Sequence, residues 1–222
     1  MPFFLPMPRF AHLIFDLDGT LVDTKADLAA ATNHVLASFA LPQLSLAQVA
    51  GYVGYGARVL VERALGPAHA GLVSRGFTLF MEYYGAHLLD HTRPYAGIEQ
   101  LLATAQAQGV ILSVLTNKPE APSRAILTGL GLAPYFREIV GGDTLPTKKP
   151  DPQGVTYLRR LTGIDLHKTL LIGDSRVDYE TGRAAGVTTC GVTWGFGVKD
   201  FATLPPQFMV NTPEQLGELV LR

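Results

Sequence analysis

The sequence of 222 residues predicts an α/β protein, with helices on both faces of a parallel sheet and a helical cap domain inserted near the start. Three observations carry this prediction. Short apolar segments alternate with helical patterns from about Arg93 onward, which is typical of a parallel sheet. One isolated apolar segment, residues 12–15, precedes that alternation, and the stretch between them is helical throughout.

The first expected strand, HLIF, runs directly into two carboxylates, those of Asp16 and Asp18. Two neighbouring negative charges at the end of a buried strand repel each other and lose hydration. We therefore expect a positive group beside them in the folded protein.

The next segment, from about residue 24 to residue 91, has helical spacing of apolar residues. Leu28, Val35 and Phe39 are spaced for a first helix, and residues 45–48, SLAQ, form a capping box that opens a second. Further helices are expected around Val59, Leu60, Ala64 and Leu65, and around Leu72, Leu79, Phe80 and Tyr83.

From about Arg93 the expected strands and helices alternate. Gly109 and Gly186 each end a helix, and Thr212 begins the last helix as its cap. Five or six strands are expected in all, counting the first. The later strands are expected within residues 110–116, 138–142, 169–174, 187–193 and 207–211, and the helices within 97–109, 121–131, 152–163, 179–186 and 212–221.

The helical block thus interrupts the sheet-forming part of the chain. We expect residues 1–22 and 93–222 to form the core domain and residues 23–92 to form the cap domain. The chain would cross between them near residues 22–25 and again near residues 92–95. This arrangement predicts a cap hinged over a core.

The composition favours a globular protein that binds neither nucleic acid nor membrane. Apolar residues make up 47% of the chain and charged residues 17%, and the formal net charge of -1 provides no basic field to attract a nucleic acid backbone. No apolar run is long enough to cross a bilayer, and the apolar segment 1–10 is broken by prolines and lacks the early positive charge of a signal peptide. Cys190 is the only cysteine, so no disulfide forms within the chain and a reducing cytoplasm fits best.

Polar side chains follow several of the expected strands at the point where each strand ends. Carboxyl ends of parallel strands lie at one edge of a sheet, where ligands bind. Carboxylates near a phosphate oxygen suit Mg²⁺, and a lysine would supply the remaining positive charge. The residues that we expect to meet there are Asp16, Asp18, Thr116, Asn117, Lys118, Asp143, Lys148, Lys149, Asp174 and Asp178.

These motifs resemble those of the haloacid dehalogenase superfamily of phosphotransferases. DLDGTLVDT (residues 16–24), Thr116 with Asn117, Lys149 in KKPDP and GDSRVD (residues 173–178) are similar to its four motifs. The resemblance implies a Rossmann-like core with a helical cap inserted after the first motif. Within the superfamily, the segments YVGYGARVLVERAL, RPYAGI and TNKPE look most like those of bacterial phosphoglycolate phosphatases.

The resemblance also implies a mechanism. Asp16 would be the nucleophile that forms an aspartyl-phosphate, and Asp18 would be the general acid and then the general base. Thr116 and backbone amides after Asp16 would donate to phosphoryl oxygens, and Asn117 and Gly19 would take part in substrate binding. Because this superfamily has its lysine immediately before proline, Lys149 rather than Lys148 is expected to neutralise charge.

The expected metal ion is Mg²⁺. The resemblance places it on a side-chain oxygen of Asp16, the backbone carbonyl of Asp18 and the carboxylate of Asp174, with Asp178 as a nearby or occasional ligand. An acid at position 18 also favours phosphoryl transfer over carbon–halogen cleavage, because a halide leaves without a proton.

The expected activity is hydrolysis of a small phosphorylated metabolite, foremost 2-phosphoglycolate, by a cytoplasmic monomer or homodimer. Arg58, in the expected cap turn, is the candidate partner for the substrate carboxylate. Two alternatives stay open. A sugar-phosphate mutase of the β-phosphoglucomutase type would share nearly every motif, and a non-enzymatic aspartate phospho-acceptor module also clusters aspartates with Mg²⁺ and lysine.

Overall fold

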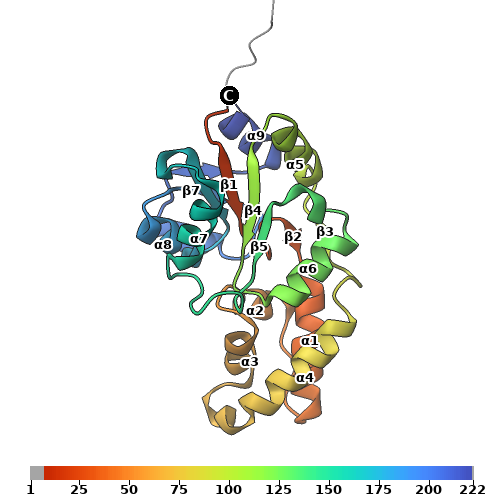
Figure 1. Ribbon diagram of the computed structural model, residues 1–222. Helices are drawn as coiled ribbons and strands as arrows, with labels where there is room; N and C mark the ends of the chain where they lie inside the picture. The colour runs from red at the N-terminus through yellow and green to blue at the C-terminus, as the bar shows by residue number, and fades with distance from the viewer. Residues whose placement is uncertain (1–7, 222) are drawn as a thin grey trace, which may run out of the picture.

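The computed structural model describes residues 8–221, so most of the apolar N-terminal segment discussed above lies outside the described residues. Its centre is a six-stranded sheet in the order β5-β4-β1-β6-β7-β8 (Figure 1). Every pair of neighbouring strands in it is parallel. The strands are β1 (His12–Phe15), β4 (Ile111–Leu115), β5 (Glu138–Val140), β6 (Thr169–Gly173), β7 (Thr188–Val192) and β8 (Phe208–Val210).

Strand β1 lies in the middle of the sheet and is buried along its whole length. Leu13 pairs in register with Leu112 of β4 and Leu170 of β6. Successive side chains of a strand point to opposite faces, and accordingly Leu13 and Ile14 belong to different apolar clusters. The residues after Phe15 therefore emerge at the centre of the sheet's carboxyl edge.

Helices cover both faces of this sheet, as predicted (Figure 1). Leu13 and Phe15 share an apolar cluster with residues of three of these helices, α5, α6 and α9. Ile14 shares another with residues of α7 and the end of α8. The bounds are α5 (Ile98–Ala107), α6 (Glu120–Gly129), α7 (Gln153–Thr162), α8 (Arg176–Ala185) and α9 (Pro213–Leu221).

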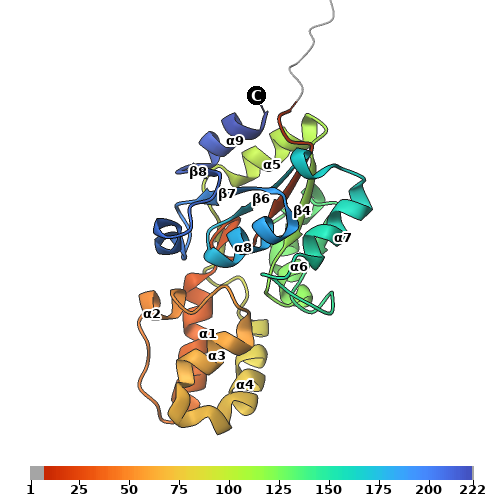
Figure 2. The ribbon, with the colours of Figure 1, turned by 90° about the vertical axis from the view of Figure 1, so that its left-hand side faces the viewer.

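The inserted block is helical and has an apolar cluster of its own, which includes Leu36, Val61 and Phe80. It lies against the carboxyl edge of the sheet, below the core in Figure 2. Ser45 and Gln48 form the predicted capping box at the start of α2. The helices are α1 (Lys25–Ser38), α2 (Leu46–Ala50), α3 (Ala57–Leu65) and α4 (Val73–Ala86), with the 3-10 helix η1 (Pro67–Leu72) between the last two.

The two chain crossings pair with each other, which the sequence did not predict. Strands β2 (Val22–Asp23) and β3 (Arg93–Pro94) form a two-stranded antiparallel ribbon. This ribbon lies where the sequence predicts the crossings. The division into a core of residues 1–22 and 93–222 and a cap of residues 23–92 stays a proposal.

The remaining elements are short. The 3-10 helices η2 (Ala133–Tyr135), η3 (Leu166–Lys168) and η4 (Val198–Ala202) were not predicted. Within residues 8–221, no helix has the length and apolar character that crossing a membrane requires.

Candidate active site

A cleft of about 340 Å³ lies between the carboxyl edge of the sheet and the cap. The core contributes Asp16, Thr116 and Asp174, which follow β1, β4 and β6. The cap contributes the turn before α3, including Gly54 and Tyr55, and apolar side chains of α3 and α4. The cleft is therefore polar on the core side and largely apolar on the cap side.

Asp16 is the first residue after β1, and its amide still donates to the carbonyl of Ile172 in the neighbouring strand, at 2.9 Å. Its side chain is 9% exposed, and its carboxylate accepts from the amide of Leu17. Burial raises the pKa of Asp16 to about 6, although the ammonium of Lys149 opposes the shift. The strand thus fixes a desolvated carboxylate at the base of the cleft.

Lys149 lies between the carboxylates of Asp16 and Asp178. Its Nζ is 2.9 Å from Oδ1 of Asp16 and 2.6 Å from Oδ1 of Asp178. Burial alone would lower the pKa of Lys149, but the charges of Asp16 and Asp178 outweigh it and raise the pKa overall. Lys148, by contrast, is exposed and donates to the carbonyl of Tyr55 in the cap.

Asp178 is held by the start of α8. The amide and the hydroxyl of Ser175 both donate to its Oδ2, at 3.2 and 2.7 Å, which completes a capping box. The other oxygen is bound to Lys149, so both carboxylate oxygens have fixed partners.

Asp174 follows β6 and has amide partners rather than an ammonium. Its Oδ2 accepts from the amides of Phe196 and Gly197, at 2.6 and 3.2 Å. Burial, together with the negative charges of Asp178 and Asp16, raises the pKa of Asp174 to about 8 against the opposing amide bonds. Among the described residues, no lysine or arginine forms an ion pair with it.

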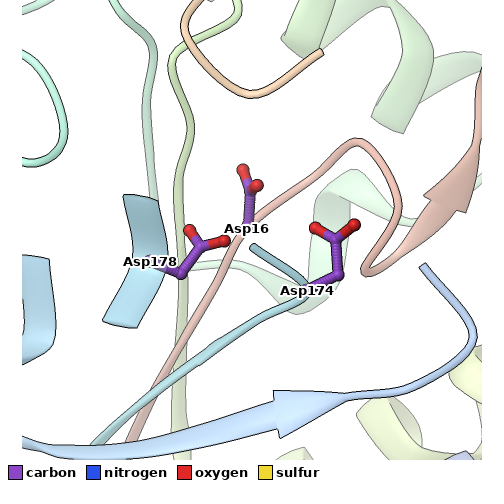
Figure 3. A group of neighbouring side chains, drawn as sticks. All are labelled: Asp16, Asp174 and Asp178. Carbon is purple, nitrogen blue, oxygen red and sulfur yellow. The ribbon is translucent and has the colours of Figure 1, made fainter. Parts of the chain in front are cut away.

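The carboxylates of Asp16, Asp174 and Asp178 face a common space (Figure 3). One oxygen from each lies within 4.8 Å of the others, and all three residues are buried. A single ammonium does not balance three carboxylates, and hard divalent cations prefer oxygen ligands. These residues fit a metal ion of that kind.

The backbone around Asp174 leaves no room for side chains. Gly19 has a φ of +83°, and a Cβ there would lie 2.4 Å from Oδ2 of Asp174. A side chain would thus need both a left-handed backbone and a displaced carboxylate. Glycine at position 19 therefore lets the loop after β1 lie directly against Asp174, within the group of Asp16, Asp174 and Asp178, here called the acidic group.

The side chain of Asp18 lies outside the acidic group and has its own lysine. Its Oδ1 accepts from Oγ1 of Thr24 at 2.8 Å, and Nζ of Lys118 lies 3.0 and 3.1 Å from its two oxygens. Burial alone would lower the pKa of Lys118, but the charge of Asp18 and the interactions with Tyr84 together outweigh it and raise the pKa overall.

Sequence reasoning noted Lys118 beside Thr116 and Asn117 but gave it no role. The signal was present, because a lysine directly after a strand end can reach the same edge as the carboxylates. The sequence gave no sign that Tyr84 of the cap would join it. Nζ of Lys118 donates to the Tyr84 hydroxyl at 2.7 Å, and burial raises the pKa of Tyr84 to about 12.

Thr116 and Asn117 lie at the end of β4. Thr116 lines the cleft, and its Oγ1 accepts from the amide of Lys118 at 3.3 Å. Nδ2 of Asn117 donates to the carbonyl of Gly54 in the cap at 2.9 Å and to the carbonyl of Lys149 at 2.8 Å. Asn117 therefore joins the cap turn to the loop that carries Lys149.

The structure does not bring Arg58 to this cleft. Its guanidinium donates to the hydroxyl of Ser74 and lies over the ring of Phe77, both on α4. Residues three apart share a helix face, and the face of α3 that lines the cleft carries Ala57, Leu60 and Arg63. Arg58 falls outside that spacing, whereas Arg63 belongs to it.

A doubly wound parallel sheet with buried carboxylates at its carboxyl edge and a helical insertion after the first strand defines a class of hydrolases with a cap. The chain belongs to the haloacid dehalogenase-like hydrolase family, whose pattern matches residues 13–192. This confirms the resemblance found in the sequence and the α/β fold class.

Similar proteins carry a common name. The phosphoglycolate phosphatase of Neisseria meningitidis serogroup A is 41% identical over 210 residues, which cover 90% of this chain and 89% of that protein. Phosphoglycolate phosphatase 1 of Pseudomonas aeruginosa is 41% identical over 88% of this chain and 73% of its own. The crystal structure of a predicted phosphoglycolate phosphatase from Haemophilus somnus 129PT has a TM-score of 0.90 and 33% identity, covering 96% of this chain and 99% of that one.

Proposed function

We propose that this hydrolase is a Mg²⁺-dependent phosphatase that releases phosphate from a small phosphomonoester, foremost 2-phosphoglycolate, through an aspartyl-phosphate on Asp16. The single observation that carries the proposal is the buried group of Asp16, Asp174 and Asp178 at the base of a cleft, with Lys149 bound to Asp16 and Asp178. The names of the similar proteins support a phosphoric monoester hydrolase and this substrate.

Asp16 suits the role of nucleophile. Its carboxylate lines the cleft on a rigid strand end, and Lys149 lies 2.9 Å from one of its oxygens. The ammonium favours the ionised form, which is the form that attacks phosphorus. The P–O bond to the leaving alkoxide breaks as the bond to Asp16 forms, and water then cleaves the acyl phosphate in a second displacement.

Asp18 suits the role of acid and base. Its carboxylate also lines the cleft, two residues further along, and its bonds to Thr24 and Lys118 hold it there. It would give a proton to the leaving alkoxide in the first displacement and accept one from the attacking water in the second.

Mg²⁺ would be held by Asp16, Asp174 and Asp178, with the backbone carbonyl of Asp18 as a further ligand. Burial and the neighbouring carboxylates raise the pKa of Asp174 to about 8, so a bound cation would stabilise the ionised form of this side chain. When bound, the ion supplies positive charge that offsets the phosphoryl oxygens and the carboxylates. Thr116 Oγ1 and backbone amides after Asp16 would donate to the same oxygens, with Asn117 and Gly19 shaping the site.

A small anionic substrate suits the cleft. Arg63, Lys118, Arg176 and Lys199 all line it, and its volume is about 340 Å³. We propose cytoplasmic turnover of a soluble metabolite by a monomer or homodimer.

The test is a phosphate-release screen of the purified protein over small phosphomonoesters, with Mg²⁺ and with a chelator. We expect release from 2-phosphoglycolate that the chelator abolishes. Asp16→Asn should keep the fold and lose about 10⁴-fold or more in kcat. Asp165→Asn is the matched control, because that carboxylate is 75% exposed. Retained turnover in Asp16→Asn would contradict the nucleophile, and a requirement for a sugar bisphosphate would favour a mutase.

A further inference from the structure

We propose that Tyr84 of the cap is a positioning residue for the acid and base of the reaction, acting through Lys118. Its hydroxyl holds the Lys118 ammonium against Asp18, so that Asp18 is oriented for proton transfer only while the cap lies on the core. The inference rests on the proposed function and adds to it a link between the cap and the chemistry.

The geometry is a continuous chain of contacts from the cap to the cleft. The Tyr84 hydroxyl accepts from Nζ of Lys118 at 2.7 Å, and that same nitrogen contacts Asp18 at 3.0 and 3.1 Å. Thr24 donates to Oδ1 of the same carboxylate. Lysine donates three hydrogens in tetrahedral directions, so two fixed acceptors determine where its ammonium lies.

Burial means that water cannot replace these contacts when one of them is lost. The side chain of Lys118 is 4% exposed and that of Asp18 is 11% exposed. A buried ammonium has little water to replace a lost acceptor, and Lys118 would have to shift to regain one. Because Asp18 is bound to the same ammonium, a shift of Lys118 changes the orientation of the carboxylate.

Tyr84 is well suited to hold this position. Its ring stacks on that of Phe80 with centroids 5.4 Å apart, and both side chains are buried in the apolar cluster of the cap. Its hydroxyl thus reaches Lys118 from a rigid surface. If the cap moved away, this acceptor would leave with it.

Away from the chain crossings, the core also binds the cap through Asn117, which donates to the carbonyl of Gly54, and through Lys148, which donates to the carbonyl of Tyr55. In both of these bonds the acceptor is a backbone carbonyl of the cap, whereas Lys118 donates to a cap side chain, the hydroxyl of Tyr84. The contact through Tyr84 leads to Asp18 from a helix inside the cap, whereas Thr24, which also binds Asp18, lies at a chain crossing. Tyr84→Phe therefore removes this link and leaves the crossing unchanged.

The test compares Tyr84→Phe with the matched control Tyr83→Phe. Tyr83 is the preceding residue on α4, but its ring stacks on His34 and His87, away from Lys118. Each variant is assayed with Mg²⁺ on 2-phosphoglycolate, whose alkoxide leaving group needs a proton, and on p-nitrophenyl phosphate, whose phenolate does not. We expect Tyr84→Phe to lose about tenfold in kcat/KM, which reports the first displacement, on 2-phosphoglycolate, the effect of one hydrogen bond to a charged group, and far less on the aryl ester. Tyr83→Phe should match the wild type on both.

A double-mutant cycle with Lys118→Met tests whether Tyr84 acts through the lysine. The loss from Tyr84→Phe should vanish when Lys118 is already methionine. Urea unfolding of the metal-free variants supplies a readout without turnover. There too, Tyr84→Phe should lower the midpoint in the wild-type background and have little effect beside Lys118→Met.

The outcomes are separable. Equal losses in kcat/KM on the two substrates, additive effects in the cycle, or a Tyr84→Phe enzyme that behaves like Tyr83→Phe would each overturn the positioning role and leave the phosphatase proposal intact. A wild-type protein that releases no phosphate from any ester would refute the proposed function, and this inference with it.

Discussion

The carboxylate of Asp27 accepts hydrogen bonds from both the amide nitrogen and Oγ1 of Thr92, at 2.8 and 2.7 Å. The amide of His91 also donates to it. Asp27 lies in the first turn of α1, where the chain enters the cap, and Thr92 lies where the chain leaves it. This buried carboxylate ties the two chain crossings together beside the β2–β3 ribbon.

Asp27→Ala should destabilise the protein by about 3 kcal/mol, because it leaves buried amides and a hydroxyl without an acceptor. The measurement is the free energy of unfolding in urea. Glu82→Ala, at an exposed position of α4, is the control and should change stability by less than about 0.5 kcal/mol. An equally small effect of Asp27→Ala would show that the crossings do not depend on this carboxylate.

The acidic group should make the metal-free protein less stable as pH rises. The pKa of Asp174 is about 8 in the folded protein, mainly through burial, against 3.8 ordinarily, so the folded state holds its proton longer than the unfolded state. Its contribution to stability is therefore present below about pH 4 and is lost as pH rises to about 8. Asp16, raised to about 6, acts in the same direction.

His12 has the opposite effect on stability. Burial lowers its pKa from 6.5 to about 4, so the stability that the neutral imidazole contributes is lost as pH falls below 6.5. Asp174→Asn keeps His12 and Asp16 but removes the titration of Asp174. The difference in unfolding free energy, wild type minus Asp174→Asn, should fall between pH 4 and pH 8 in the absence of metal. Added Mg²⁺ should stabilise the wild type above this range more than the variant, because it binds the ionised form. A difference that stays constant with pH would contradict the assignment.

Gly56→Ala should weaken the contact between the cap turn and the core. Gly56 has φ +92° and ψ 164°, a backbone conformation that is essentially restricted to glycine. An added Cβ would also lie 3.0 Å from the carbonyl oxygen of Asn117. We expect a loss of about 2 kcal/mol in stability and about tenfold in kcat/KM on 2-phosphoglycolate. Gly85→Ala, in α4 with open space around it, is the control and should be neutral or slightly stabilising. Full activity in Gly56→Ala would argue against a close cap turn during turnover.

Arg63, rather than Arg58, should recognise the substrate carboxylate, because Arg63 lines the cleft and lies 4.6 Å from the ring centroid of Tyr55 in the cap turn. Arg63→Ala should raise KM about tenfold for 2-phosphoglycolate and leave KM nearly unchanged for an ester without a carboxylate, such as glycerol 2-phosphate. Arg58→Ala should affect neither. Steady-state kinetics on the two esters decide the point, and the reverse pattern would restore Arg58 as the partner.

Most strands and helices of the core and the cap could be predicted because their signals are local. The pattern of apolar segments gave the strands, and glycines and caps gave the ends of helices, as at Gly109 and Ser45. The two residues of β2 and the two of β3 escaped detection because strands this short carry no periodicity, and they pair only because two distant segments meet.

The sequence by itself determined that the residues after β1, β4 and β6 would meet, since parallel strands bring their carboxyl ends to one edge whatever their exact neighbours. Asp16, Asp174 and Asp178 followed from that rule alone. Only the tertiary structure decided which lysine pairs with which carboxylate. It places Lys149 beside Asp16, and Lys118, with Tyr84, beside Asp18. The physical reason is that an ion pair or hydrogen bond depends on separations of a few ångströms, and these are set by how the loops after the strands pack together and, for Tyr84, by how the cap packs on the core.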